Sequence, residues 1–490
     1  MGIIQRQTVR TTAITLVGTV VGAASQLLLP FVFSEQEQIG ALAVLNAVSR
    51  IFAITFALGF AQVTLQVFSF FRDEERGHSG FLIFGVVVSL IGGLLGLASF
   101  YLFHDYFIGT GPEYQLIRSI SYLIFPIIFF RIFFTNLDPY LRMLFSSVFG
   151  ALWEGLILKM VILIAVLLFW LGWIDYTYTA YLYAAALCLP GLAVIVLSIL
   201  KTKPIVLPRR EHFTTEKRKN LMLYSFFGIL GTASGVLVVS IDQVMVNKMV
   251  GTDAAGVYSV LFFAGILISI PARGLKRIAV PVLAESWKRN DQKEILDVYK
   301  KSVVNQTVVA VYLFVTGWLC IGPVLTFLPD YTHGLYVFFF IGLAQLFDMM
   351  TGVNMEIIAT SNRYRWNTYF NVLLAILVIG LNLVFIHYWG IVGAAGASAL
   401  AMLLVNISRW YFLKKVYGFQ PFDRSAPIAV LIGIMIVGLF ELLPLNFSPI
   451  IRMLIYSLSI TFIYWGIIFL LDLAPDTKKW VYKIKRKLFT

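Results

Sequence analysis

Long runs of apolar residues, each about the length of a membrane span, alternate with short polar segments along the whole chain. A helix needs roughly 20 apolar residues to cross a hydrocarbon core of about 30 Å. Backbone groups cannot stay unpaired in lipid, and the sequence lacks the short alternating segments of a membrane barrel, so the runs predict helices. We expect an all-α integral membrane protein with about fourteen transmembrane helices, at residues 11–33, 41–71, 81–103, 117–137, 146–171, 178–200, 221–249, 256–280, 303–328, 334–358, 368–388, 393–413, 427–444 and 451–471.

The loops between these runs divide by charge. Most of the 38 lysines and arginines lie in the even-numbered loops and at the two ends of the chain. The odd-numbered loops contain neither residue but carry acids such as Glu35, Asp105 and Asp253. Positively charged loops stay in the cytoplasm, so both termini are predicted to be cytoplasmic. The net charge of +13 is then a sign of topology, and we expect no nucleic-acid partner, because the chain has no soluble basic domain.

Two short segments recur at nearly the same spacing. "SEQEQIGALAVL" resembles "VGTDAAGVYSVL", which aligns Gly40 with Gly256, and "WLGWI" resembles "HYWGIVG", which aligns Gly172 with Gly390. The offsets predict two parallel six-helix lobes around a central cavity, related by an axis along the membrane normal. Chance similarity between apolar segments is the alternative. The predicted organisation is an N-terminal lobe (1–200), a basic cytoplasmic linker (201–220), a C-terminal lobe (221–413), two extra helices (427–471) and a basic cytoplasmic tail (472–490).

Three basic residues fall inside predicted helices of the first lobe and are candidates for substrate binding. They are Arg50, Arg131 and Lys159. A charge at this depth is costly against lipid and normally faces a cavity or a partner. Together they would suit an anionic group such as a pyrophosphate, which arginine can bind through two parallel hydrogen bonds. The alternative is structural pairing, for example of Lys159 with Glu154 or Asp348. Four other bases are expected to reach the headgroups from helix ends: Arg118, Lys248, Arg409 and Arg452.

Acids inside predicted helices are candidates for binding a coupling proton or sodium ion. Asp242 lies in the seventh predicted helix. In the tenth, Asp348 and Glu356 recur with Gln345 and Gly352 at a spacing that places all four on one helical face. A polar stripe on an apolar helix usually faces water or another helix. These acids are therefore either cation sites or counter-ions to the buried bases.

Other kinds of chemistry find little support. Cys188 and Cys320 are far apart in sequence and the five histidines lack ligand spacing, so we expect no metal site and no cofactor. The sequence has no phosphate-binding loop, so hydrolysis of ATP within this chain cannot drive transport. Glycan ligases and polymerases need a large outer loop, which the chain lacks. A glycosyltransferase would need the acidic segment 72–78 ("RDEERGH"), which we interpret as a solvated turn. We therefore expect no enzyme activity.

Two segments resemble a known transporter family. "NVLLAILVIGLNLVFIHYWGIVGAAGASALA" (371–401) is similar to helices 11 and 12 of the polysaccharide exporter and oligosaccharide flippase family, and "SIDQVMVNKMVGTDAAGVYSVLFF" (240–263) is similar to its helix 7 to helix 8 segment. The N-terminal "MGIIQRQTVRTT" also resembles that family. It belongs to the superfamily of multidrug, oligosaccharidyl-lipid and polysaccharide exporters. The helix number and loop pattern agree over the whole chain, whereas the sharp motifs cover only about 60 residues.

The resemblance implies alternating access in a bacterial inner membrane. Its implied cargo is an undecaprenyl-pyrophosphate-linked oligosaccharide moved to the outer leaflet for a surface polysaccharide such as O-antigen of lipopolysaccharide. Partners would be the lipid-linked substrate, membrane lipids, a proton or sodium counter-ion, and a polysaccharide polymerase or ligase. Relatives that flip cell-wall precursors carry several arginines in early helices, whereas helix 1 here has Gln26, which favours a surface glycan. The alternative is a multidrug antiporter of the same superfamily, which typically has twelve helices.

The predicted topology can be tested with single cysteines in a cysteine-free protein. A cysteine at Gly111, in an outer loop, should react with an impermeant thiol reagent in intact spheroplasts. A cysteine at Asn290, in an inner loop, should react only after lysis. The reverse labelling pattern would contradict the orientation that the loop charges predict.

Overall fold

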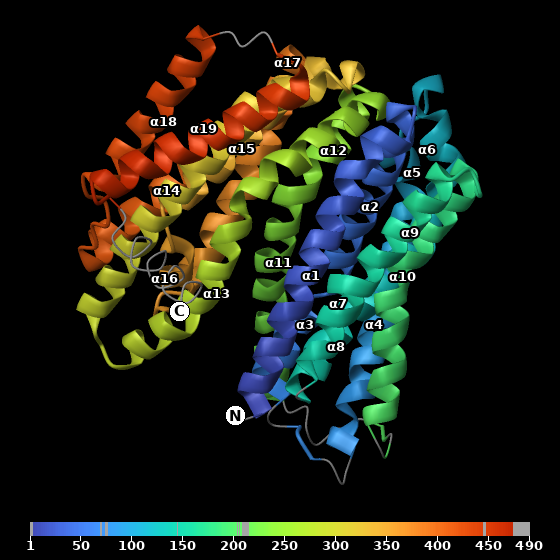
Figure 1. Cartoon of the computed structure of the whole chain (residues 1–490). Coiled ribbons are helices and arrows are strands. Elements are labelled where there is room, and N and C mark those ends of the chain that lie inside the picture. The colour runs from blue at the N-terminus through green and yellow to red at the C-terminus, as the bar shows by residue number, and fades with distance from the viewer. Residues whose placement is uncertain are drawn as a thin grey trace. The chain divides into compact units, whose positions relative to one another are not determined.

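The computed structural model describes residues 3–68, 71–73, 77–144, 146–202, 204, 206–207, 215–443 and 447–473. Every regular element among them is a helix, as Figure 1 shows. Most of the predicted tail (474–490) and part of the predicted linker (208–214) lie outside the described residues. Their placement in the cytoplasm stays a prediction.

The chain divides by packing into two compact units, Met1–Val260 and Leu261–Thr490. The first unit contains α1 (Ile3–Val32), α2 (Gln36–Phe56), α3 (Phe60–Val67), α4 (Phe81–Leu102), α5 (His104–Ile108), α6 (Gln115–Ile120), α7 (Ile124–Met143), α8 (Ser147–Leu152), the π-helical turn η5 (Trp153–Ile157), α9 (Leu158–Trp170), α10 (Tyr176–Lys201) and α11 (Thr215–Met249). Helix α12 (Thr252–Ile266) crosses the division. The second unit continues with α13 (Ile270–Lys288), α14 (Gln292–Leu325), α15 (Leu335–Met350), α16 (Asn354–Thr360), α17 (Arg365–Tyr417), α18 (Ser425–Leu442) and α19 (Pro449–Leu470).

Twelve helical segments in the described chain are long and apolar enough to span a membrane. A thirteenth is α11, in which Gly228–Leu237 and Val239–Met249 meet at 54°. The fourteenth comes from α17, which has 53 residues and would be about 80 Å long if straight, more than twice the hydrocarbon thickness. The chain is thus an all-helical, multi-pass membrane protein, as the hydrophobic pattern predicts.

Helix α17 folds back on itself at Gly390. This glycine has φ 53° and ψ −134°, a backbone conformation that breaks the helix. The two arms lie side by side, because Arg409 donates a hydrogen bond to the Asn371 side chain at 2.8 Å and the rings of Trp366 and Phe412 lie 4.9 Å apart. Residues about 40 positions apart can meet in this way only in an antiparallel hairpin. The two arms correspond to the predicted helices 368–388 and 393–413.

The two glycines aligned by the sequence repeat touch each other. Gly40 on α2 packs against the backbone oxygen of Thr252 at the start of α12, and Gly256 on α12 packs against the backbone oxygen of Gln36 at the start of α2. Gln36 and Thr252 differ by the same 216 positions as the glycines, so the contact is reciprocal. Such a contact is the signature of a local two-fold axis, in which equivalent surfaces meet. It supports the parallel repeat over chance similarity.

The division by packing falls later in the chain than the predicted lobe boundary at 201–220. Helix α11 belongs to the first unit, where Gly59 packs against the backbone of Ser225 and Gly228 packs against Gln62. The units are defined by contacts between residues, whereas the lobes are defined by similar segments along the sequence. The boundary between the units therefore need not coincide with the boundary between the lobes. The predicted lobe ranges stay a prediction.

The first unit contains a buried aromatic core. Phe60, Phe68, Phe81 and Tyr140 are all buried in it. His78 lies against this cluster, with its ring 5.4 Å from Phe68, and is only 3% exposed. The interpretation of 72–78 as a solvated turn is therefore wrong at His78; residues 74–76 of that segment lie outside the described chain.

Gly390→Ala should destabilise the protein, because a Cβ is unfavourable at this φ and ψ; a strained residue costs about 1–3 kcal/mol. Gly380→Ala in the same helix is the matched control. Gly380 is helical, and a Cβ added there would have no neighbouring atom within 4 Å, so alanine should be neutral or slightly stabilising. Thermal unfolding of the purified variants in detergent measures both effects. Equal melting temperatures would contradict the tight turn at Gly390.

Candidate functional site

The guanidinium of Arg131, on α7, is held by helix α2. Its Nη2 donates to the side-chain oxygen of Asn46 at 2.6 Å, while Nη1 donates to the Asn46 backbone oxygen at 3.0 Å and to Ser49 Oγ at 3.1 Å. These three bonds fix the orientation of the guanidinium plane. Asn46 and Arg50 are four positions apart and share one face of α2. Arg131 on α7 thus bonds to Asn46, which lies one helical turn before Arg50 on α2. In this way the structure brings together two of the predicted substrate-binding residues.

Arg50 itself is exposed and lies in the second half of α2. The helix begins at Gln36, five residues before the predicted start, so Arg50 lies about 21 Å along it at 1.5 Å per residue. A charged residue exposed on a membrane span is costly unless it meets water or an opposite charge. Arg50 and Arg131 also repel each other electrostatically. An anion bound at this point would relieve that repulsion.

One acid partly compensates these bases. Glu154 interacts electrostatically with Arg50, Arg131 and Arg142, and Arg142 forms an ion pair with buried Asp138. We call these five residues the basic cluster. With three bases and two acids, it keeps an excess of one positive charge, all on helices of the first unit.

A π-helical turn presents Glu154. The turn spans Trp153–Ile157 between α8 and α9, and such turns occur frequently at functional sites because the extra residue redirects neighbouring side chains. Helix α1 approaches it closely: Gly18 packs directly on the backbone oxygen of Gly155, where any side chain would clash. Gly18 therefore supports the turn that carries Glu154.

Gln26 is on helix α1, and the side chain of Lys159, on α9, packs against the same helix. The Lys159 side chain crosses Gly22, so that a Cβ at this glycine would lie 2.8 Å from Lys159 Cδ. Gln26 is half-buried and follows Gly22 by one helical turn on the same face. These two predicted substrate-binding residues thus form a second group beside α1, and Lys159 is on the helix that follows the π-turn of Glu154.

Asp242, on α11, is fully buried. It accepts a hydrogen bond of 2.8 Å from the hydroxyl of Tyr258 on α12, which is also fully buried. The Lys248 ammonium lies 3.0 Å from the centre of the Tyr106 ring, and its backbone oxygen accepts a hydrogen bond from Tyr114. Lys248 is exposed near the end of α11 and its ammonium lies over an aromatic ring; that it reaches the headgroups stays a prediction.

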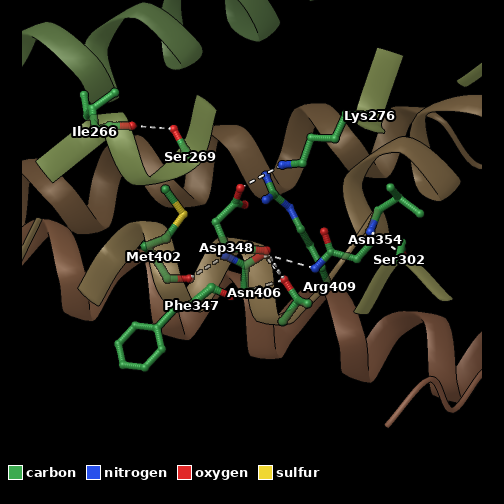
Figure 2. Close-up of polar contacts among 12 residues, drawn as sticks. Ile266, Ser269, Lys276, Ser302, Phe347, Asp348, Asn354, Met402, Asn406 and Arg409 are labelled. Carbon is green, nitrogen blue, oxygen red and sulfur yellow. Dashed lines mark hydrogen bonds and ion pairs between the residues drawn. The ribbon is translucent and has the colours of Figure 1, made fainter. Parts of the chain in front are cut away.

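The second unit contains a separate polar network, which Figure 2 shows. Lys276 on α13 donates to Asp348 Oδ2 at 2.7 Å, and both side chains are mostly buried. Figure 2 shows the Arg409 side chain, from α17, extending toward the Asp348 carboxylate. Glu356 interacts electrostatically with Lys276, Asp348 and Arg409. The structure therefore brings the two predicted acids together through two bases.

Amide side chains complete this network beside the charges. The Asn406 side-chain oxygen accepts hydrogen bonds from Thr351 Oγ1 and from the Asn354 amide, each at 3.0 Å. The Asn406 amide nitrogen donates to the Met402 backbone oxygen at 3.1 Å. Thr351, Asn354 and Asn406 are all nearly or fully buried.

Two sequence interpretations of this region were wrong. Arg409 does not reach a headgroup but is 3% exposed and bonded to Asn371. The predicted stripe on one helix is interrupted, because α15 ends at Met350 and Gly352 has φ 64°. Lys276 falls near the end of the predicted helix 256–280, and in the structure it lies within the candidate span Thr252–Lys288. Only the structure shows that Lys276 interacts with two acids, Asp348 and Glu356.

In the described chain, no group of three or more His, Cys, Asp or Glu side chains is arranged to hold a metal ion. Both cysteines are free thiols, Cys188 in the first unit and Cys320 in the second.

Comparison with known proteins identifies the fold. No protein-family model and no curated protein matches the sequence. Among solved structures, the chain is similar to the lipid II flippase MurJ in an inward closed conformation, with a TM-score of 0.74 and 14% identity over 94% of this chain and 99% of that one. It is also similar to an inward-facing multidrug resistance MATE family transporter of the MOP superfamily, with a TM-score of 0.61 and 14% identity over 89% and 99% of the two chains.

A third similar structure is a MOP superfamily transporter from Pyrococcus furiosus that is described as having a binding pocket of reverse polarity. Its TM-score is 0.51, with 14% identity over 89% of this chain and 96% of that one. Identities this low carry no information on cargo. The chain has the all-helical, two-lobed fold of MOP-superfamily transporters.

Proposed function

We propose that this protein is a flippase that moves an undecaprenyl-pyrophosphate-linked oligosaccharide from the cytoplasmic to the outer leaflet of a bacterial inner membrane, by alternating access and without ATP hydrolysis. The observation that carries the proposal is the basic cluster, whose Arg50 is exposed on a membrane span beside a fixed Arg131. A pyrophosphate that crosses a low-dielectric region needs a positive counter-charge on the protein. Gln26 on α1, and Lys159 on α9 where it crosses Gly22 of α1, add polar groups for its head.

The basic cluster fits the anionic part of the cargo, which is common to many lipid-linked sugars. The chain shares its fold with a lipid II flippase, while the cargo class proposed here rests on the basic cluster. Gln26 in place of an early-helix arginine favours a surface glycan over the cell-wall precursor. A multidrug antiporter is the second candidate, since MATE transporters share the fold, but an excess of positive charge is poorly suited to cationic drugs.

Arg50→Ala should nearly abolish flipping of a lipid-linked oligosaccharide by purified protein in liposomes without ATP. Loss of a hydrogen bond to a charged group costs about 1.5–3 kcal/mol, which weakens cargo binding roughly ten- to a hundredfold. Arg50→Lys should keep part of the activity, because the charge remains while the paired hydrogen bonds are lost. Arg424→Ala, at an exposed arginine next to α18, is the control and should remain active. Full activity of Arg50→Ala would remove this residue from the site, and transport that requires added ATP would overturn the proposed mechanism.

We also propose that Asp242 couples transport to a proton or another cation. It is an ionisable group buried at the junction of the repeats, close to the reciprocal contact between α2 and α12. Moving one charge through a potential of 100 mV supplies about 2.3 kcal/mol, enough to bias a transport cycle. The alternative is that its bond to Tyr258 only holds α11 against α12.

Asp242→Asn should fold, because the amide oxygen can still accept the Tyr258 hydrogen bond, but flipping should no longer respond to an imposed ion gradient. Tyr258→Phe is the matched control: it keeps the acid, loses about 1 kcal/mol of stability and should keep the gradient response. Flipping rates in liposomes with and without the gradient distinguish the two roles. A normal gradient response in Asp242→Asn would end the coupling hypothesis.

A further inference from the structure

The acids Asp348 and Glu356 are balanced within their own unit. They face two bases, Lys276 and Arg409, so the four side chains are neutral together. The basic cluster of the first unit, in contrast, keeps an excess positive charge. A buried group of charges that is already neutral offers little attraction to a further ion.

The Lys276 ammonium occupies the position that a free cation would need. It lies 2.7 Å from Asp348 Oδ2, and the exposed fractions of the two side chains are 21% and 19%. A free cation at this carboxylate would have to displace the ammonium or lie beside it, next to Arg409. Two like charges at such separation repel strongly where water is scarce.

The neutral oxygen atoms nearby are also occupied. The Asn406 side-chain oxygen already accepts two hydrogen bonds, from Thr351 and Asn354. Hard cations are bound by several oxygen atoms at once, from carboxylates, amides, backbone or water. Glu356 Oε2 is buried without a hydrogen-bond partner, and Arg409 Nε is likewise unpartnered although this side chain is only 3% exposed. The acids are therefore compensated mainly by the charge of the two bases, and Asp348 also interacts with the Asn406 side chain.

We propose that Lys276 is a tethered counter-cation, which occupies the Asp348–Glu356 site in place of a free monovalent cation such as Na⁺. While Lys276 is present, these acids bind no free ion and take no part in ion coupling. Its removal turns the same residues into a cation site, with Asp348 and Glu356 as the charged ligands. The inference refines the proposed transport mechanism by excluding one pair of coupling acids, but ion binding can be measured without any cargo.

The test compares the melting temperature of purified protein in NaCl with that in N-methyl-D-glucamine chloride at equal ionic strength. The wild-type protein should show no Na⁺-specific shift that depends on Asp348, so wild type and Asp348→Asn should respond to Na⁺ alike. Lys276→Met should gain a melting temperature that rises with Na⁺ and saturates, because a ligand that binds only the folded state stabilises it. Lys288→Met, at an exposed lysine in the last turn of α13, is the matched control and should gain nothing.

Lys276→Met/Asp348→Asn should lose the gained Na⁺ response, which assigns the new site to this carboxylate. A saturable Na⁺ shift in the wild-type protein that Asp348→Asn abolishes would overturn the proposal, as would a Lys276→Met protein that folds but does not respond to Na⁺. If Lys276→Met alone does not fold, the double variant decides. If the double variant folds, the result supports the pairing of Lys276 with Asp348, because the double variant leaves neither charge of this pair buried without the other. A double variant that also fails to fold contradicts the proposal. Because none of these measurements uses the cargo, their outcome is separate from that of the Arg50 flipping assay.

Discussion

A charged side chain inside a membrane span must meet an opposite charge, a hydrogen-bond partner or water, and this requirement organises both units. Arg131 meets it with three hydrogen bonds to α2, and Arg409 meets it with a hydrogen bond to the opposite arm of its own hairpin. Lys276 meets it with an acid on a different helix. The positions of these partners fix which helices pack together, because a helix that moved away would leave a charge behind in a medium of low dielectric constant.

The membrane spans could be predicted from the sequence because each carries its own signal. A run of apolar residues defines a span whatever surrounds it, and the fourteen predicted runs correspond to the helices, including the two arms of α17. Glycine positions carried a second signal, since the alignment of Gly40 with Gly256 anticipates a contact that the structure contains. The sequence predicted that Arg50, Arg131 and Lys159 lie inside helices of the first lobe, whereas the bonds from Arg131 to the turn of α2 that precedes Arg50 come from the structure.

The second-unit network could not be predicted, and the reason lies in the rule that gave the topology. Lysines and arginines near the ends of apolar runs are normally cytoplasmic or reach the headgroups, so Arg409 was assigned there, and nothing in the predicted helix 256–280 marked Lys276 as the partner of an acid. The side chain of such a residue points into the protein only if another helix contributes an acid beside it. Which helices pack together cannot be predicted from either segment alone. The break at Gly352 has the same character: the helical spacing of Asp348 and Glu356 continues through it, and only the positive φ reveals two helices.

The two units differ in how they neutralise the charges inside their membrane spans, and this difference bears on the mechanism. The sequence repeat relates two segments of the chain whose glycines, Gly40 and Gly256, make a reciprocal contact inside the first unit. The charged residues of the two units do not repeat in this way. In the first unit, Arg50 is exposed and the basic cluster has one more base than acids. An anion bound there would make this cluster neutral. The second unit neutralises its own acids and needs no ligand to be stable. The anionic cargo that we propose would therefore change the electrostatic energy of the first unit far more than that of the second, so its binding would act on a transport cycle chiefly through the first unit.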